Sequence, residues 1–217
     1  MKISSLQKGL VGHWTMSQDS LKGSLLADKT PYENDGTIYG ATFTTDRKGQ
    51  ANKAMSFDGV NDYVEKVNFN LNKGLNTLSL WIKVLSLPST SSIIFIHQPS
   101  KTGLGFYQGN SFILTSGASV DKQRRCDLSN FIVGQWNHVL ISYNESNIPS
   151  VYINGREPNY LSSNYWTQTS TTLFLGKRDT GNFFNGQIDD VRIYNYALTD
   201  TQIKTLYNQN STVRFGE

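Results

Sequence analysis

The chain has 217 residues, of which 37% are hydrophobic and 12% aromatic, and its 20 Lys and Arg residues exceed its 17 Asp and Glu residues to give a net charge of +3. The basic residues are scattered along the sequence rather than grouped in a stripe, so nucleic acid is not an expected partner. No apolar run approaches the roughly 20 residues of a membrane-spanning helix, so we expect no membrane insertion, and the single Cys126 excludes an intrachain disulfide bond.

The length suits one domain, because sandwich proteins of about 200 to 250 residues commonly fold as a single unit. No internal repeat, low-complexity tract or linker divides the sequence, so we expect one domain over residues 1–217 with a core over residues 9–208. Residues 1–12 lack the apolar core of a signal peptide. The chain is therefore either not exported by a cleaved signal or one piece of a longer secreted chain.

Most of the sequence alternates between apolar and polar residues with a period of two, and Gly, Asn, Asp or Ser residues interrupt it at short intervals. Aromatic and β-branched residues suit the pleated, half-buried surface of a sheet. The pattern predicts strands over residues 10–16, 36–43, 54–57, 63–67, 77–84, 92–97, 103–108, 111–115, 136–143, 151–153, 172–177 and 187–194. These are enough for two stacked sheets.

Three of these segments carry more detailed signals. In residues 77–84 one face is apolar, which places Trp81 on the outer face of its strand, whereas residues 136–143 are apolar on both faces and predict a strand covered from both sides. The dipeptide Asn154-Gly155 tolerates positive φ angles and predicts a tight two-residue reversal.

Near the C-terminus, Ile188 and Val191 are three residues apart, so a straight strand would send them to opposite faces. A β-bulge at Asp189-Asp190 would let both pack inward. After this strand we expect one short helix over residues 200–207, with Thr199 as its cap and Gln202 reaching back as in a capping box. The predicted fold class is all-β, a two-sheet antiparallel sandwich with one short C-terminal helix.

Five stretches resemble the laminin-G-like family of concanavalin A-type sandwiches, and together they run from Gly9 nearly to Asn208. They read GLVGHW at 9–14, NDGT at 34–37, AMSFDGVNDYV at 54–64, GQWNHV at 134–139 and GQIDDVRIYNYALT at 186–199. The resemblance implies a jelly-roll sandwich of this type. In the third stretch, Asp58 and Asp62 are placed to accept backbone N–H groups across a turn.

The resemblance also implies calcium, because members of this family often bind it at one end of the sandwich. The matching positions are Asp189, with loop oxygens near Asp28 and Asn34. Calcium binds about six to eight oxygens, which carboxylates, Asn side chains and loop carbonyl groups can supply. The alternative is that Asp189 satisfies backbone amides of a neighbouring loop. Lys29 departs from the family pattern, since a lysine cannot ligate a cation and adds repulsion.

Hydrolases that share this sandwich place two carboxylates two residues apart on one strand, beside the glycosidic bond. No predicted strand contains such a Glu-x-Asp run, and Asp189 and Asp190 are adjacent. His13, His97 and His138 fall on separate predicted strands without metal-type spacing, which favours structural histidines. We therefore predict that the chain is not an enzyme, with glycoside hydrolysis the less favoured alternative.

Sugar recognition uses aromatic rings beside polar groups, and exposed loops on a rigid scaffold are where function concentrates. Four aromatic residues in or beside Asn-, Ser- and Gly-rich stretches are predicted ligand contacts, namely Tyr107, Tyr165, Trp166 and Phe183. The first hypothesis is a binding or adhesion module at the cell surface that recognises a glycan or a surface protein. The second is a structural surface-display protein, such as a virion decoration domain, which would form a homo-oligomer or join a larger assembly.

Overall fold

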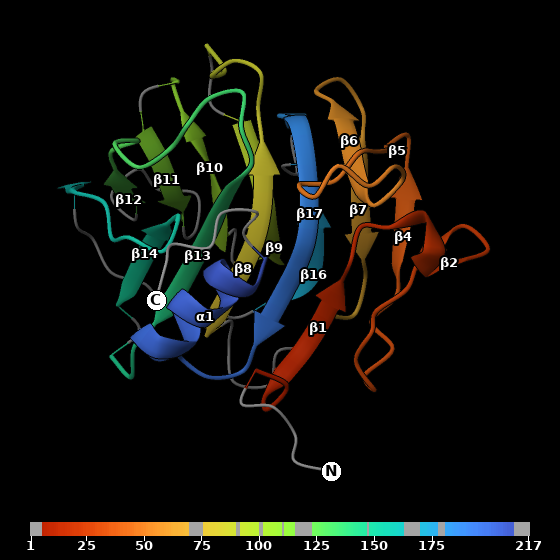
Figure 1. Ribbon diagram of the computed structural model, residues 1–217, viewed down its shortest axis with the longest axis horizontal. Helices are drawn as coiled ribbons and strands as arrows, with labels where there is room; N and C mark the ends of the chain where they lie inside the picture. The colour runs from red at the N-terminus through yellow and green to blue at the C-terminus, as the bar shows by residue number, and fades with distance from the viewer. Residues whose placement is uncertain are drawn as a thin grey trace.

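The computed structural model describes residues 6–69, 76–89, 92–99, 102–109, 111–115, 123–146, 148–162, 170–177 and 181–210. Figure 1 shows a sandwich of strands with one helix near the C-terminus. In chain order the elements are β1 (Leu10–Trp14), the 3-10 turn η1 (Gln18–Ser20), β2 (Leu21–Lys22), β3 (Leu25–Leu26), β4 (Gly36–Tyr39), β5 (Thr42–Thr44), β6 (Ala54–Asp58), β7 (Tyr63–Lys66), β8 (Thr77–Lys83), β9 (Ser92–Pro99), β10 (Thr102–Tyr107), β11 (Ser111–Thr115), β12 (Gln123–Cys126), β13 (Asn137–Tyr143), β14 (Pro149–Ile153), β15 (Tyr160–Ser162), β16 (Ser170–Leu175), β17 (Asn185–Tyr194) and α1 (Asp200–Asn210).

The strands form two sheets. Among the described residues, sheet A has seven strands in the order β14-β13-β8-β17-β6-β5, and β1 also pairs with β17, while sheet B has ten strands in the order β15-β12-β11-β10-β9-β16-β7-β4-β3-β2. Neighbouring strands run antiparallel, as in β13 against β8 and β16 against β7. The predicted two-sheet antiparallel sandwich is confirmed.

The main core lies between the two sheets and is built from alternate residues of each strand. On β8, Leu78, Leu80 and Ile82 are fully buried in it, whereas Trp81 points to the other side of sheet A. Each buried aliphatic side chain of this kind contributes about 1.5–3 kcal/mol. The period-two pattern of residues 77–84 therefore predicted the orientation of this strand correctly.

Helix α1 covers the outer face of sheet A, in front of β13 and β8 in Figure 1. Its buried residues Ile203 and Leu206 pack with Leu140 of β13 and Tyr194 of β17 in a second apolar cluster. This explains why every residue of β13 is buried, as the double-sided apolar pattern predicted. Within the described residues no helix is both long and apolar enough to cross a membrane.

The capping box at the start of α1 is confirmed. The Thr199 N–H donates to Gln202 Oε1 at 3.0 Å, and the Gln202 N–H donates back to Thr199 Oγ1 at 3.4 Å. These two bonds satisfy donors that a helix N-terminus otherwise leaves free. The helix extends three residues beyond the predicted end at Tyr207, to Asn210.

The segment predicted as one strand over residues 36–43 is two strands in different sheets. β4 pairs with β7 in sheet B, whereas β5 pairs with β6 in sheet A. The chain changes sheet at Gly40, whose φ is +71°. Glycine adopts this backbone angle freely, whereas other residues are strained there. Ile38, Ala41 and Phe43 pack against the main core, so the inward positions shift by one residue between Ile38 and Ala41, and the prediction of a single strand overlooked this shift.

Arg124 and Arg125 lie in strand β12, a strand that the alternation of apolar and polar residues did not predict. β12 pairs with β11, which places Cys126 opposite Phe112 in the main core. Cys126 is therefore the buried small residue that we expected, and burial raises the pKa of its thiol to about 12.

Two predicted turns are present. Asn154 and Gly155 both have positive φ angles, and Ile153 and Arg156 exchange backbone hydrogen bonds of 2.8 and 3.1 Å across them. After β6, the Asp58 N–H donates to Asp62 Oδ2 at 2.9 Å, so the carboxylate stabilises the turn as expected.

Candidate functional site

Strand β17 contains the predicted β-bulge. Asp189 lies opposite Trp81 of β8 and Arg192 lies opposite Ser79, so two residues of β17 are matched by one residue of β8. The extra length is absorbed at Asp190, whose φ is 49°. A bulge of this kind re-aims the side chains next to it.

The bulge directs apolar and acidic side chains to different sides of sheet A. Ile188 and Val191 are both fully buried in the main core, as the sequence predicted. The carboxylates of Asp189 and Asp190 contact a shared guanidinium on the other side of the sheet, although both residues are less than 10% exposed. The bulge thus places two adjacent acidic groups together in a largely buried position.

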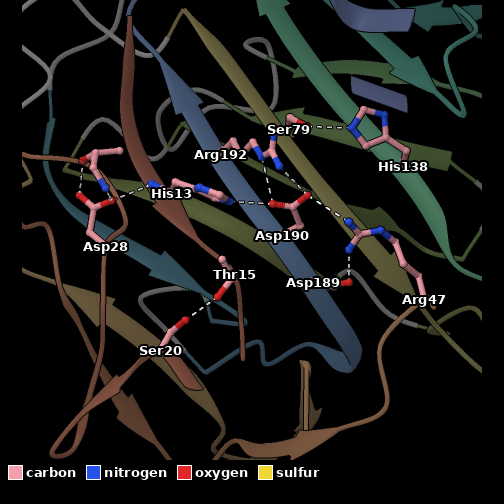
Figure 2. A network of polar contacts seen from close by, with 11 residues as sticks. His13, Thr15, Ser20, Asp28, Arg47, Ser79, His138, Asp189, Asp190 and Arg192 are labelled. Atoms are coloured by element: carbon pink, nitrogen blue, oxygen red, sulfur yellow. Dashed lines mark hydrogen bonds and ion pairs between the residues drawn. The ribbon is translucent and has the colours of Figure 1, made fainter. Parts of the chain in front are cut away.

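Three basic side chains surround these acids (Figure 2). We call the five residues the Asp189/Asp190 cluster, which consists of His13, Arg47, Asp189, Asp190 and Arg192. Arg47 Nη1 donates to Asp189 Oδ2, and Arg47 Nη2 donates to Asp190 Oδ2 at 3.2 Å. Arg192 holds Asp190 from its own strand with bonds of 3.0 and 3.1 Å, and His13 Nε2 of β1 lies 2.8 Å from Asp190 Oδ1. Charges that are buried to this extent are stable only when paired in this way.

The two carboxyl groups differ in their proton affinity. Burial raises the pKa of Asp189 to about 7, while the nearby Arg47 opposes that shift. Burial would also raise the pKa of Asp190, but the hydrogen bond from His13 and the charge of Arg192 hold it well below its usual range. Asp190 is therefore the firmly ionised member of the pair.

A polar cleft of about 410 Å³ opens beside this cluster. Thr15, Ser20 and Lys29 line it together with the cluster residues, and Thr15 Oγ1 lies 2.6 Å from Ser20 Oγ (Figure 2 shows this contact). The lining is charged and hydroxyl-rich and contains no aromatic ring among the residues that the structure describes. Its described lining therefore offers no aromatic ring on which a sugar could stack.

The three predicted calcium ligands do not fit that ion as they are arranged. Both oxygens of Asp28 accept hydrogen bonds, from the backbone N–H of His13 at 2.8 Å and of Asn34 at 3.0 Å, and from Thr30. The Asn34 side-chain amide donates to the Val11 carbonyl at 3.0 Å. Asp28 therefore organises its own loop.

Asp189 is no better placed for calcium, because the guanidinium of Arg47 occupies its carboxylate and would repel a cation. Over the described parts of the chain, no three His, Cys, Asp or Glu side chains are grouped so as to hold a metal ion. Calcium binding stays a prediction from the resemblance that these contacts do not favour.

His138 lies on the same outer face of sheet A, next to the cluster. Its Nε2 is 2.8 Å from Ser79 Oγ, and its ring lies 5.1 Å from that of Trp81 (Figure 2 shows the Ser79 contact). Burial lowers the pKa of this histidine to about 3, so it is neutral. The three histidines lie on β1, β9 and β13, as predicted, and His13 and His138 have structural partners.

Sheet B presents a group of aromatic rings on its outer face, and we call Tyr39, Tyr63, Phe174, Phe183 and Lys177 the aromatic face. The rings of Tyr39 and Tyr63 stack at 4.4 Å with an interplanar angle of 13°. Phe174 and Phe183 lie 6.2 and 6.4 Å from Tyr63, and Lys177 Nζ lies 3.8 Å from the centre of the Tyr63 ring.

Tyr107 lies on the same side of sheet B as the aromatic face. Leu104 and Phe106 of β10 point into the main core, so the alternate residue Tyr107 points outward. The guanidinium of Arg125 on β12 stacks over its ring at 4.4 Å. This outer face of sheet B therefore combines aromatic rings with positive charges.

Two of the four predicted ligand contacts, Tyr107 and Phe183, lie on the outer side of sheet B, and of these Phe183 belongs to the aromatic face. Tyr165 and Trp166 lie outside the described residues. Sequence reasoning missed Tyr39 and Tyr63, because they belong to regular strands, whereas ligand contacts were expected in loops. The signal was present in the alternation, since Ile38 and Val64 point inward and their neighbours therefore point outward.

Solved structures share this fold. The chain superposes on *Trypanosoma rangeli* sialidase in complex with sialic acid with a TM-score of 0.70 and 19% identity, over 94% of this chain and 34% of that chain. A second similar structure is domain 4 of AbnA, a GH43 extracellular arabinanase from Geobacillus stearothermophilus, in complex with arabinotriose. Its TM-score is 0.67 and its identity 24%, over 91% of this chain and 98% of that chain. Botulinum neurotoxin type C superposes with a TM-score of 0.74 and 17% identity, over 97% of this chain and 53% of that chain.

These similarities correct one prediction. The sequence led us to expect that the chain is not an enzyme, yet the proteins with this fold include a sialidase and a domain of an arabinanase. The fold is shared by enzymes and non-enzymes, so our exclusion of an enzyme is overturned. At these identities the likeness shows the fold alone, and the chain spans about a third of the sialidase chain.

No curated protein matches the sequence significantly. A family model does match, over residues 58–204, which is more than half of the chain and includes β7 to β17. The match covers the strands that place the bulge and most of the aromatic face. The chain therefore belongs to the concanavalin A-like lectin/glucanases superfamily, as its laminin-G-like motifs indicated.

Proposed function

We propose that this chain is a carbohydrate-binding module that works outside the cell or at its surface, with the aromatic face as its glycan platform. The observation that carries the proposal is the stacked pair Tyr39 and Tyr63, with an interplanar angle of 13°, on the outer side of sheet B. Flat aromatic surface of this kind matches the C–H faces of pyranose and furanose rings.

The geometry makes the platform rigid before a ligand arrives. One side of the Tyr63 ring is covered by Tyr39, and Lys177 lies over the ring as well. Tyr39 is 40% exposed, so part of its ring remains accessible to a sugar. Binding then costs little side-chain ordering, because the contacts hold the rings in place already.

Polar groups beside the rings supply the hydrogen bonds that orient a sugar. Glu65 of β7 lies next to Tyr63 on the same strand face, two residues along, and Lys177 contributes an ammonium group. A carboxylate and an ammonium group beside an aromatic surface fit a hydroxyl-rich ligand.

The similar structures support this function without assigning it. *Trypanosoma rangeli* sialidase binds sialic acid, AbnA domain 4 binds arabinotriose, and entry of botulinum neurotoxin type C depends on ganglioside molecules. A related toxin binding domain forms a complex with synaptotagmin II, so a surface protein is a second class of partner on this scaffold. Glycan binding is the function that the aromatic face favours.

The proposal is tested by screening neutral, arabinose-containing and sialylated oligosaccharides on an array and measuring the best ligand by calorimetry. Replacing Tyr39 with Ala should weaken binding about fivefold or more, since stacking of a ring on an aromatic side chain is worth about 1–3 kcal/mol. Tyr32→Ala is the matched control, because Tyr32 is a 62% exposed tyrosine on the 30–33 loop. No bound glycan, or equal losses in both variants, would contradict the proposal.

A further inference from the structure

A second pocket lies where α1 meets the turn after β14, on the opposite side of the sandwich from the aromatic face. Its volume is about 510 Å³, and residues from three segments line it, among them Asn130, Arg156, Lys204, Tyr207 and Asn208. Two of these residues carry positive charge, and no acidic side chain contributes to the lining. The pocket is therefore positive.

The two cations are available to a ligand. Arg156 and Lys204 are exposed, and within the described residues neither forms an ion pair. They come from different elements, Arg156 from the turn after β14 and Lys204 from α1. A guanidinium and an ammonium that face one pocket suit a carboxylate, because charge-assisted hydrogen bonds to an anion are about twice as strong as neutral ones.

Tyr207 gives the pocket an aromatic wall whose position is fixed. Its ring stacks on Trp81 at 5.9 Å and on His138 at 6.0 Å, and both of those side chains are buried. A Cβ added at Gly155 would lie 3.1 Å from Tyr207 Cδ1, so the glycine lets the turn approach the edge of the ring closely. The wall is ordered by contacts that do not involve a ligand.

We propose that this pocket binds a carboxylate-bearing sugar residue, of the uronic or sialic acid class. The carboxylate pairs with Arg156 and Lys204, the apolar face of the ring packs on Tyr207, and the side-chain amides of Asn130 and Asn208 meet the hydroxyl groups. Each element of such a ligand has a counterpart among the lining residues. The proposal does not depend on the aromatic face, which lies across the sandwich.

The test is a titration of the full chain with glucuronate, N-acetylneuraminate, glucose and inorganic sulfate, followed by calorimetry and by NMR shifts of the α1 amides. We expect saturable binding of at least one of the two acids and no saturation by glucose. The double variant Arg156→Gln, Lys204→Gln should weaken that binding about tenfold or more, since two charge-assisted contacts are lost. Lys22→Gln, on β2 of sheet B, removes one positive charge away from the pocket and should leave binding unchanged.

The controls separate this pocket from the aromatic face. Tyr39→Ala should not alter acid binding, whereas it weakens glycan binding at the aromatic face. Tyr207→Phe keeps the ring and should retain binding, which checks that the wall acts through its apolar surface. The proposal is overturned if neither acid saturates, if glucose or sulfate binds as tightly as the acids, or if the double variant binds like Lys22→Gln.

Discussion

Arg47 and Asp189 form a buried ion pair although 142 residues separate them in the chain. Arg47 follows β5, whereas Asp189 lies at the bulge of β17. The same guanidinium reaches Asp190 at 3.2 Å and lies 5.1 Å from the centre of the Trp81 ring. One side chain thus connects the 45–50 loop to the two central strands of sheet A.

This relationship predicts a large cost for removing Arg47. Arg47→Gln leaves Asp189 buried beside the ionised Asp190 without its main cation, and breaking a buried pair in this way typically costs about 3–5 kcal/mol. Urea unfolding at neutral pH measures the loss. Lys48→Gln, at the exposed neighbouring position, should change the free energy of unfolding by less than about 0.5 kcal/mol. Similar losses in the two variants would mean that the pair contributes no specific stability.

His138 and Asp189 should affect the pH dependence of stability in opposite directions. The folded pKa of His138 is about 3, below its unfolded value of about 6.5, so the unfolded chain binds more protons and stability falls as pH falls through this range. The folded pKa of Asp189 is about 7, above its unfolded value of about 3.9, so stability falls as pH rises from about 4 to 7.

Between about pH 4 and 6.5 these two slopes oppose each other, each with a limit of about 1.4 kcal/mol per pH unit. Asp189→Asn should therefore make the free energy of unfolding rise more steeply with pH than it does in the unmodified chain, and His138→Gln should make it fall. Urea unfolding at several pH values in this range provides the slopes. Parallel profiles for all three proteins would contradict the assignment.

The crossing between the sheets at Gly40 predicts a local sensitivity. A Cβ at Gly40 would clash with the Asp62 carboxylate, and the φ of +71° adds strain of about 1–2 kcal/mol for a residue other than glycine. Gly49 has a similar φ of +78° but no heavy atom within 4 Å of its added Cβ. Gly40→Ala should thus lower the melting temperature clearly more than Gly49→Ala. Equal shifts would show that the contact with Asp62 is easily relieved.

The contacts of Asp28 and Asp189 predict how the protein responds to calcium. Because Arg47 already neutralises Asp189 and backbone N–H groups occupy Asp28, added calcium should leave the melting temperature unchanged, as should a chelator. Thermal scans across a range of calcium concentrations decide this. A saturable rise in melting temperature that Asp189→Asn abolishes would restore the calcium site that the family resemblance implies.

Local patterns in the sequence predicted the features that depend on neighbouring residues. The alternation in β8, the double-sided burial of β13 and the turn at Asn154 follow from residues that are close in the chain. The bulge was predictable for the same reason, since the spacing of Ile188 and Val191 requires an extra residue in the strand.

Features that depend on distant residues were not predictable in this way. Arg47 has no local signal that it pairs with Asp189, because sheet pairing alone brings its loop to the bulge. The aromatic face joins Tyr39 of β4, Tyr63 of β7 and Phe174 of β16, which become neighbours only through the register of sheet B. The change of sheet at Gly40 was missed because the one-residue shift of the inward positions between Ile38 and Ala41 was read as one continuous strand.

Mapping a bound oligosaccharide by NMR tests the central claim most directly. Backbone amide shifts are recorded while the best glycan from the array is titrated into the labelled chain. The account predicts that saturable shifts concentrate on β4, β7 and β16, around Tyr39, Tyr63 and Phe174, and that Tyr39→Ala reduces them. Saturable shifts confined to other strands, or their absence for every glycan class screened, would contradict the assignment of the aromatic face as the glycan platform.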